Sequence, residues 1–132
     1  MKIGVDTNVL LRFVVGDDET QQRYAAETLK TATFIAVSVQ SLCEFAWVLD
    51  RTYRVDRAAV GEAIRRILNM RNVVTDRAAI EAGLAVLSAG GDFADGVIAF
   101  EGRWLGGETF VSFDKKAVKL LNAQGIAARL PA

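Results

Sequence analysis

The chain has 132 residues and a mass of 14.3 kDa, which is the usual size of one compact domain. Its 16 basic and 16 acidic residues give a formal net charge of zero, so no strong overall field draws it towards nucleic acid or an anionic membrane. One cysteine and no histidine are present. This composition excludes an intramolecular disulfide, a cysteine- or histidine-based zinc site and any mechanism with a histidine base. Hydrolytic chemistry in this chain would need carboxylates.

The chain shows no targeting or membrane-spanning pattern. An acid, Asp6, interrupts the start before the apolar core of a secretory signal can form. The longest uncharged stretch, 31–43, is rich in Thr, Ser and Gln and is too polar to cross a bilayer as a helix. Together with the single Cys43, these features predict a cytoplasmic protein that does not enter a membrane.

Short apolar runs and helical patterns alternate along the chain. Strands are expected at 3–5, 34–37, 72–75, 109–113 and 126–130, and helices at 19–30, 41–53, 57–70, 77–89, 93–105 and 115–123. Because the strands lack polar alternation and helices separate them, we expect an α/β fold with a parallel sheet that helices cover on both faces. No repeat or flexible linker divides the chain, so residues 1–132 are expected to form one domain.

Two acids stand out in the first half of the chain. Asp6 directly follows the first predicted strand, where an Asp often caps a helix, and capping and catalysis fit this position equally. Glu44 is the only charged residue between positions 31 and 49, and no basic residue lies three or four positions away from it. An ionised acid in an apolar setting needs a hydrogen-bonded partner or a metal, so either a salt bridge elsewhere in the chain or a metal site is expected.

Three more acids stand near the starts of the last two predicted helices. Asp92 is the expected cap of the helix 93–105, and Asp95 is either its capping-box partner, a favourable charge in the first turn or a metal ligand. Asp114 follows the strand 109–113, where capping is again the simplest role. Lys115 and Lys116 form either a solvated face or a contact with phosphate.

The acids Asp6, Glu44, Asp95 and Asp114 together predict a metal site. One parallel sheet would gather strand ends and helix starts at its carboxyl edge. Carboxylate oxygens suit Mg²⁺ or Mn²⁺, whereas four clustered acids without a cation would repel one another. A bound cation lowers the pKa of an attacking water and polarises a phosphodiester, so hydrolysis by a metal-activated water needs no histidine.

The segments around these acids resemble the PIN-domain family, specifically the VapC-like toxins of bacterial toxin–antitoxin pairs. The resemblance is carried by DTNVLLR at 6–12, LCEF at 42–45, DFAD at 92–95 and SFDKK at 112–116, and it spans nearly the whole chain. It implies a five-stranded parallel sheet of order 3-2-1-4-5 and an endoribonuclease that cuts RNA with Mg²⁺ or Mn²⁺. It also implies a homodimer that a small cognate antitoxin inhibits.

The same resemblance implies roles for single residues. The acids Asp6, Glu44, Asp95 and Asp114 match the family's catalytic metal ligands; Asn8, Asp92 and Ser112 match polar neighbours of the ligands; and Arg12, Lys115 and Lys116 are weaker candidates for contact with RNA. The chain departs from the family at Gly96, where Ala is usual, and at Ser112, where Thr is commoner. Gly96 allows a closer backbone approach at a cost of up to about 1 kcal/mol of helix propensity.

Two other functions compete with this one. The opening segment also resembles haloacid-dehalogenase-like phosphatases, but Asn8 stands where those enzymes need a second carboxylate. A non-catalytic RNA- or protein-binding module on the same fold is the other alternative, and the presence of all four acids favours catalysis over it. The aromatic residues Phe45, Trp47, Phe100 and Trp104 are expected in the core or at a dimer contact rather than as platforms for bases.

Overall fold

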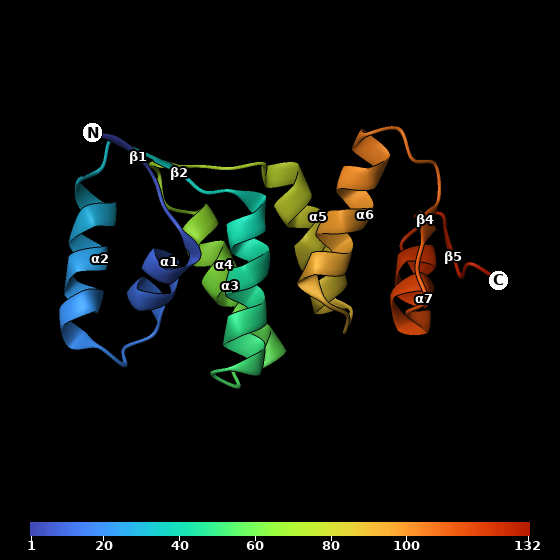
Figure 1. Cartoon of the computed structure of the whole chain (residues 1–132), viewed down its shortest axis with the longest axis horizontal. Coiled ribbons are helices and arrows are strands. Elements are labelled where there is room, and N and C mark those ends of the chain that lie inside the picture. Colours follow the sequence, from blue (N-terminus) through green and yellow to red (C-terminus); the bar gives the residue numbers. More distant parts are fainter. The chain divides into compact units, whose positions relative to one another are not determined.

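A computed structural model describes all residues, Met1–Ala132, and shows an α/β chain with parallel strands and seven helices (Figure 1). The chain divides into two compact units, Met1–Asp76 and Arg77–Ala132. In Figure 1 the first unit runs from blue to green, and the second from yellow to red. The α/β class expected from the sequence is confirmed by the parallel strands and the helices between them.

The first unit contains a parallel sheet of three short strands in the order β1-β2-β3. The register pairs Ile3 of β1 with Ile35 of β2, and Ile35 with Val73 of β3. Ile35 is fully buried, as expected for an apolar residue on a central strand. The strand bounds are β1 Lys2–Gly4, β2 Phe34–Ala36 and β3 Val73–Val74.

Four helices pack in the first unit: α1 Thr7–Val14, α2 Glu19–Thr31, α3 Val39–Arg51 and α4 Arg57–Leu68. Helix α1 is missing from the helices expected from the sequence, although its inward face of Thr7, Leu10 and Leu11 has helical spacing. Helix α1 contacts α2 and α3, and α3 contacts α4. Side chains at or near full burial from these helices form the core: Leu10, Leu29, Leu42, Phe45, Leu49, Ile64 and Ile67.

The second unit contains helices α5 Arg77–Ser88, α6 Phe93–Trp104 and α7 Lys115–Ala123, and the parallel strands β4 Phe110–Val111 and β5 Ala128–Arg129. Its core includes Val86, Ala99, Leu121 and Ala128, with Phe110 packed against them. Among the aromatic residues expected to be buried or in a contact, Phe45 is fully buried and Phe100 half-buried, whereas Trp47 and Trp104 are exposed.

The strands form two sheets, of three and two strands, and not the single five-stranded sheet that the resemblance implied. The partial orders 3-2-1 and 4-5 are both present, and every pairing is parallel. Strands β2 to β5 are shorter than their predicted runs, and β1 keeps its predicted length but begins one residue earlier, because strand bounds depend on backbone pairing, which composition alone does not specify. The correction therefore concerns the continuity of the sheet and the length of its strands.

Helices α5 and α6 approach closely through two glycines. A Cβ on Gly96 would collide with the backbone carbonyl oxygen of Ala82 and would lie 2.8 Å from the Cα of Gly83. A Cβ on Gly83 would in turn lie 2.7 Å from the ring of Phe93. Gly96, the departure from the family pattern, is thus a packing requirement of this helix pair.

We expect Gly96→Ala to destabilise the protein by about 1–3 kcal/mol, because the two atoms nearest to the new methyl group belong to the backbone and cannot rotate away. The gain in helix propensity, up to about 1 kcal/mol, offsets only part of this cost. Urea unfolding measures the change. Gly102→Ala on the same helix is the control, since its Cβ meets nothing within 4 Å and should stabilise slightly. Equal stability of the two variants would contradict the packing argument.

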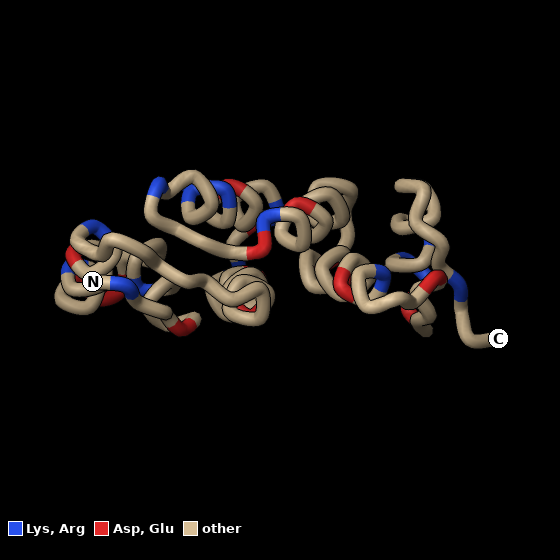
Figure 2. The backbone as a smooth tube through the Cα atoms, turned by 90° about the horizontal axis from the view of Figure 1, so that it is seen from above, with Lys and Arg blue, Asp and Glu red and all other residues tan.

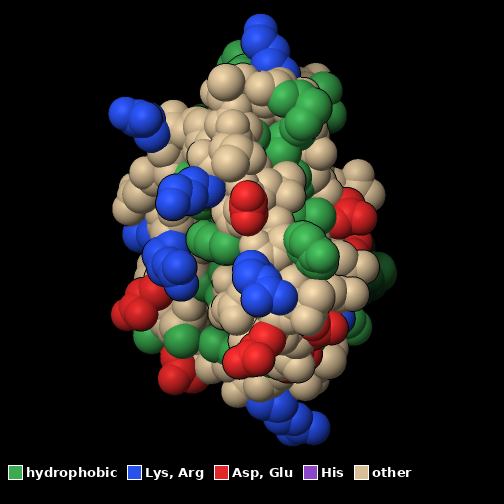
Figure 3. Space-filling view, turned by 90° about the vertical axis from the view of Figure 1, so that its left-hand side faces the viewer, with side chains coloured by type: hydrophobic (Ala, Val, Ile, Leu, Met, Phe, Trp, Pro, Cys, Tyr) green, Lys and Arg blue, Asp and Glu red, His purple; other side chains and the backbone are tan.

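Charges of both signs are interspersed along both units, as Figure 2 shows on the backbone. In the space-filling view of Figure 3, Lys and Arg side chains lie beside Asp and Glu side chains over the end of the first unit. This mixture agrees with the net charge of zero. No helix combines the length and the apolar character that crossing a bilayer would need.

Candidate active site

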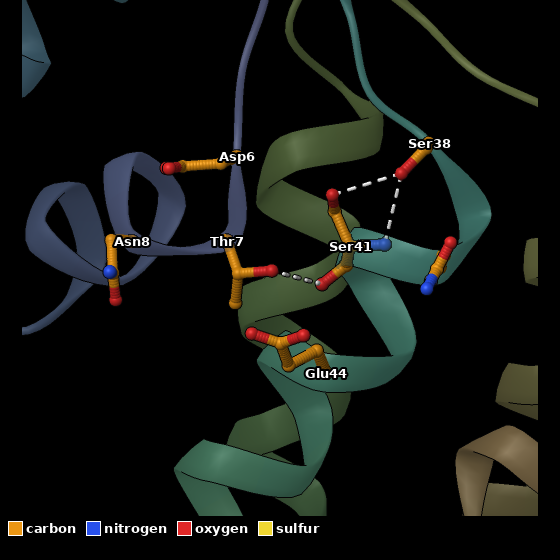
Figure 4. A pocket seen from close by; sticks show the side chains of 7 residues that line it. Asp6, Thr7, Asn8, Ser38, Ser41 and Glu44 are labelled. Carbon is orange, nitrogen blue, oxygen red and sulfur yellow. Dashed lines mark hydrogen bonds between the residues drawn. The ribbon is translucent and has the colours of Figure 1, made fainter.

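Asp6 and Glu44 line the same hollow on the first unit. Asp6 lies between β1 and α1, and Glu44 lies on α3. The hollow is open, has a volume of about 260 Å³ and also contains the predicted residue Asn8 (Figure 4). Its complete lining is Asp6, Thr7, Asn8, Ser38, Gln40, Ser41 and Glu44. Two of the four predicted acids are thus brought together by the packing of α1 against α3.

Asp6 also caps helix α1, as its position predicted. Its Oδ1 accepts a hydrogen bond of 3.1 Å from the backbone N–H of Val9, and the backbone of Asp6 is extended. Figure 4 shows the carboxylate above the beginning of α1. The cap uses only Oδ1, and the Asp6 side chain is exposed, so its carboxylate remains accessible to a ligand.

Glu44 is exposed and forms no ion pair, so the expected salt bridge is not present. Its apolar neighbours in the sequence, such as Leu42 and Phe45, turn to the buried side of α3. Because Glu44 itself faces water, its charge is solvated and does not need a partner for stability. A carboxylate held on the rim of a hollow without a cation partner is available to a ligand.

Four lining residues were not singled out from the sequence: Thr7, Ser38, Gln40 and Ser41. Thr7 is only 6% exposed, and its Oγ1 donates a long hydrogen bond of 3.5 Å to the backbone oxygen of Ser41. Ser38 caps α3 by accepting from the N–H of Ser41 at 3.0 Å. These contacts position the start of α3, one turn before Glu44, against the start of α1. The helical spacing of Thr7 with Leu10 and Leu11 was the signal that could have identified it.

The second unit carries the other predicted acids. Asp95 lies half-buried in the first turn of α6, and Asp92 occupies the cap position of that helix without a side-chain hydrogen bond to it. Asp114 caps α7 by accepting from the N–H groups of Lys116 and Ala117, at 3.0 and 3.1 Å. The capping role expected of Asp114 is therefore present, whereas the expected side-chain cap by Asp92 is not.

Asp95 is electrostatically linked to the other two acids of this unit. Burial raises its pKa above the ordinary value of an aspartate, and repulsion from Asp92 and Asp114 raises the pKa further. Ser112 contacts one of these acids, because its Oγ accepts a 3.0 Å hydrogen bond from the backbone N–H of Asp114. The negative charges of Asp92 and Asp114 therefore act on Asp95.

We expect the metal-free protein to lose stability as pH rises through the folded pKa of Asp95. A raised pKa means that the folded state binds this proton more tightly, so the penalty is absent below the unfolded value of ~3.9 and complete above the folded pKa. Asp95→Asn should therefore stabilise the metal-free protein at neutral pH, and this gain should shrink towards pH 4. Urea unfolding at several pH values measures it. Glu101→Gln on the same helix controls for the loss of one charge; an Asp95→Asn effect independent of pH would contradict the assignment.

The basic residues suggested for RNA contact are placed differently from one another. Arg12 is already engaged, because its Nη1 lies 2.8 Å from Oδ1 of Asp17. The hydroxyl of Tyr53 donates to the other oxygen of Asp17 at 3.0 Å, and these bonds lower the pKa of Asp17. Lys115 and Lys116 begin α7, are exposed and form no ion pair. The two lysines are therefore more available to phosphate than Arg12 is.

The donor atoms of the predicted acids suit a hard divalent cation. All are carboxylate oxygens, which Mg²⁺ and Mn²⁺ prefer, and neither unit offers competing Cys or His ligands at these positions. Within neither unit do three acidic side chains lie close enough together to hold a metal ion.

Comparison with known protein families matches residues 3–121 to the PIN domain. The chain belongs to the PIN-domain family. The matched range of this PIN domain includes both units and all four predicted acids, from Asp6 to Asp114. A comparison with curated proteins found no match.

Membership confirms the resemblance at the level of the family. PIN domains are generally nucleases that act on RNA or other nucleic acids, and they typically use divalent metal ions. The opening segment around Asp6 is thereby explained as the start of a PIN domain, and its likeness to haloacid-dehalogenase-like phosphatases does not extend further. The acids described above are the natural candidates for the nuclease chemistry of this PIN domain.

Proposed function

We propose that this PIN domain is a Mg²⁺- or Mn²⁺-dependent endoribonuclease and the toxin of a toxin–antitoxin pair. The observation that carries the proposal is the pairing of acids within each unit of a PIN-family chain. Asp6 and Glu44 line one hollow, and the field of Asp92 and Asp114 acts on Asp95. Repulsion between neighbouring acids is typical of a site that binds a cation.

In this proposal Asp6, Glu44, Asp95 and Asp114 are the metal ligands, and residues 1–132 form one domain. When bound, the cation supplies Lewis-acid chemistry, which polarises a phosphodiester and lowers the pKa of the attacking water. The amide of Asn8 and the hydroxyl of Ser112 orient ligands or waters beside the acids. Asp92 keeps the surroundings of Asp95 negative, and Lys115 and Lys116 bind backbone phosphates of the RNA, with Arg12 as a weaker contact.

The remaining features of the proposal come from the family likeness. The protein works in the cytoplasm as a homodimer, and a small cognate antitoxin inhibits it.

Incubation of the purified protein with labelled single-stranded and structured RNAs tests the proposed activity. We expect discrete fragments in the presence of Mn²⁺ or Mg²⁺. RNA binding without cleavage under any divalent ion would instead identify a non-catalytic binding module. For the toxin role, we expect expression of the chain to arrest growth and co-expression of a small adjacent reading frame to restore it; growth that continues unchanged would contradict that role.

A further inference from the structure

Helix α3 carries one exposed stripe that begins at the acidic hollow and continues beyond it. Gln40, Glu44, Trp47 and Arg51 are all exposed, and their spacing places them within an arc of about 60° around the helix axis. Gln40 and Glu44 line the hollow with Asp6. Trp47 follows Glu44 by one turn, about 4.5 Å along the axis. A ligand chain that leaves the hollow along α3 therefore meets Trp47 next.

Trp47 is not a core residue, which was one of the two roles expected for it, the other being a dimer contact. It is 58% exposed, although the residues before and after it on the inner face, such as Phe45 and Leu49, are buried. The guanidinium carbon of Arg51 lies 5.9 Å from the centre of the Trp47 ring. This contact restrains the indole and leaves it open to water.

We propose that Trp47 is a stacking platform for one base of a single-stranded RNA whose neighbouring phosphodiester lies at the acids of the hollow. This inference rests on the proposed nuclease function and adds a residue that binds the substrate. Aromatic side chains bind unpaired bases by stacking, which works for every base and cannot occur with a base inside a helix. The stripe thus places an acid and an aromatic ring one helical turn apart.

The charges around Trp47 fit a nucleotide better than an uncharged ligand. Arg51 is exposed and can contact the phosphate that follows a stacked base. Asp50 lies 3.4 Å from Arg51, but both side chains are more than 60% exposed, so this ion pair is easily exchanged for a phosphate. The stripe therefore offers a ring for the base and a cation for its phosphate.

The second unit repeats the combination of an exposed ring and an acid. Phe113 is 85% exposed and lies between Ser112 and the helix-capping Asp114. An aromatic residue with so little apolar contact gains nothing for stability at this position. Its recurrence beside a second proposed acid supports a substrate whose bases are free to stack.

Kinetics with an unstructured oligoribonucleotide test the role of Trp47. We expect Trp47→Ala to raise KM roughly 5- to 150-fold, the effect of one lost stacking contact, with a much smaller change in kcat. Trp47→Phe should restore most of the affinity, since a phenyl ring also stacks. Tyr24→Ala is the matched control: Tyr24 is an exposed aromatic residue of the same unit, 69% exposed, on α2 and outside the hollow. Its KM should stay unchanged.

Fluorescence gives a readout that a merely structural role would not produce. Trp47 and Trp104 are the two tryptophans of the chain, so Trp104→Phe leaves Trp47 as the single indole and Trp47→Phe leaves Trp104. In an Asp95→Asn background, where cleavage is expected to be absent, RNA should quench the emission of Trp47 and leave that of Trp104 unchanged. Anisotropy of labelled RNA confirms binding in both variants.

Unquenched Trp47 emission in the presence of bound RNA, or a normal KM for a folded Trp47→Ala protein, would overturn the stacking role. Either result leaves RNA cleavage by the natural chain intact. Absence of cleavage by the natural chain would overturn the proposed function instead, and quenching of Trp47 by RNA would still support a stacked base. The two proposals therefore fail by different observations.

Discussion

Asp6→Asn is expected to lower RNA cleavage by roughly 10²-fold or more while the fold stays intact. The amide removes the negative charge but keeps an oxygen that can accept the hydrogen bond from the N–H of Val9. Asn and Asp are about equally good helix caps, so α1 should remain stable. Cleavage rates and urea unfolding, measured on the same preparation, separate the loss of charge from any loss of capping.

Asp18→Asn and Asp56→Asn are matched controls for this substitution. Asp18 caps α2 and Asp56 caps α4, each through a hydrogen bond of about 3 Å that is similar to the one Asp6 makes. Neither residue lines the hollow. Both variants should cleave RNA at the normal rate, and an active Asp6→Asn protein would remove Asp6 from the mechanism.

Removal of divalent cations is expected to stop RNA cleavage completely, and added Mg²⁺ or Mn²⁺ should restore it. The chain contains no histidine that could serve as a base, and its proposed site consists of carboxylates. The measurement is the rate of fragment formation in excess chelator, before and after addition of each ion. Restoration on adding an ion excludes irreversible damage by the chelator.

Cleavage that continues in excess chelator would contradict the metal assignment. Protein treated with chelator and then dialysed into Mn²⁺ serves as the control for folding. Unchanged unfolding by urea with and without chelator would show that the loss concerns chemistry rather than stability.

The helices could be predicted largely because their ends are marked by local chemistry. Helix α7 begins after its cap Asp114 at the residue expected, and α4 begins after the cap Asp56. Helix α1 was not predicted as a helix, because a segment of eight residues is too short for its helical spacing to be distinctive. Strand lengths and the division into two sheets depend on backbone pairing between distant segments, which local pattern does not reveal.

The sequence predicted two acids that lie together in the structure, but it did not predict their setting. Asp6 and Glu44 were identified from position and isolation in the sequence, and they do line one hollow. The sequence predicted an apolar setting for Glu44. This prediction was wrong, because the apolar residues around it in the sequence lie on the opposite side of α3. Thr7 and Ser38 matter through contacts between helices, and Gly96 through the approach of α5 to α6. Such contacts arise only in the folded chain.

Mn²⁺ binding to four proteins tests the central claim most directly: the natural chain, Asp6→Asn, Asp95→Asn and the double variant. Asp6 belongs to the first unit and Asp95 to the second. We expect calorimetry to show a large loss of Mn²⁺ affinity in each single variant, because each removes one proposed carboxylate ligand, and no Mn²⁺ binding in the double variant. Normal Mn²⁺ binding in either single variant would contradict the claim that these acids are metal ligands.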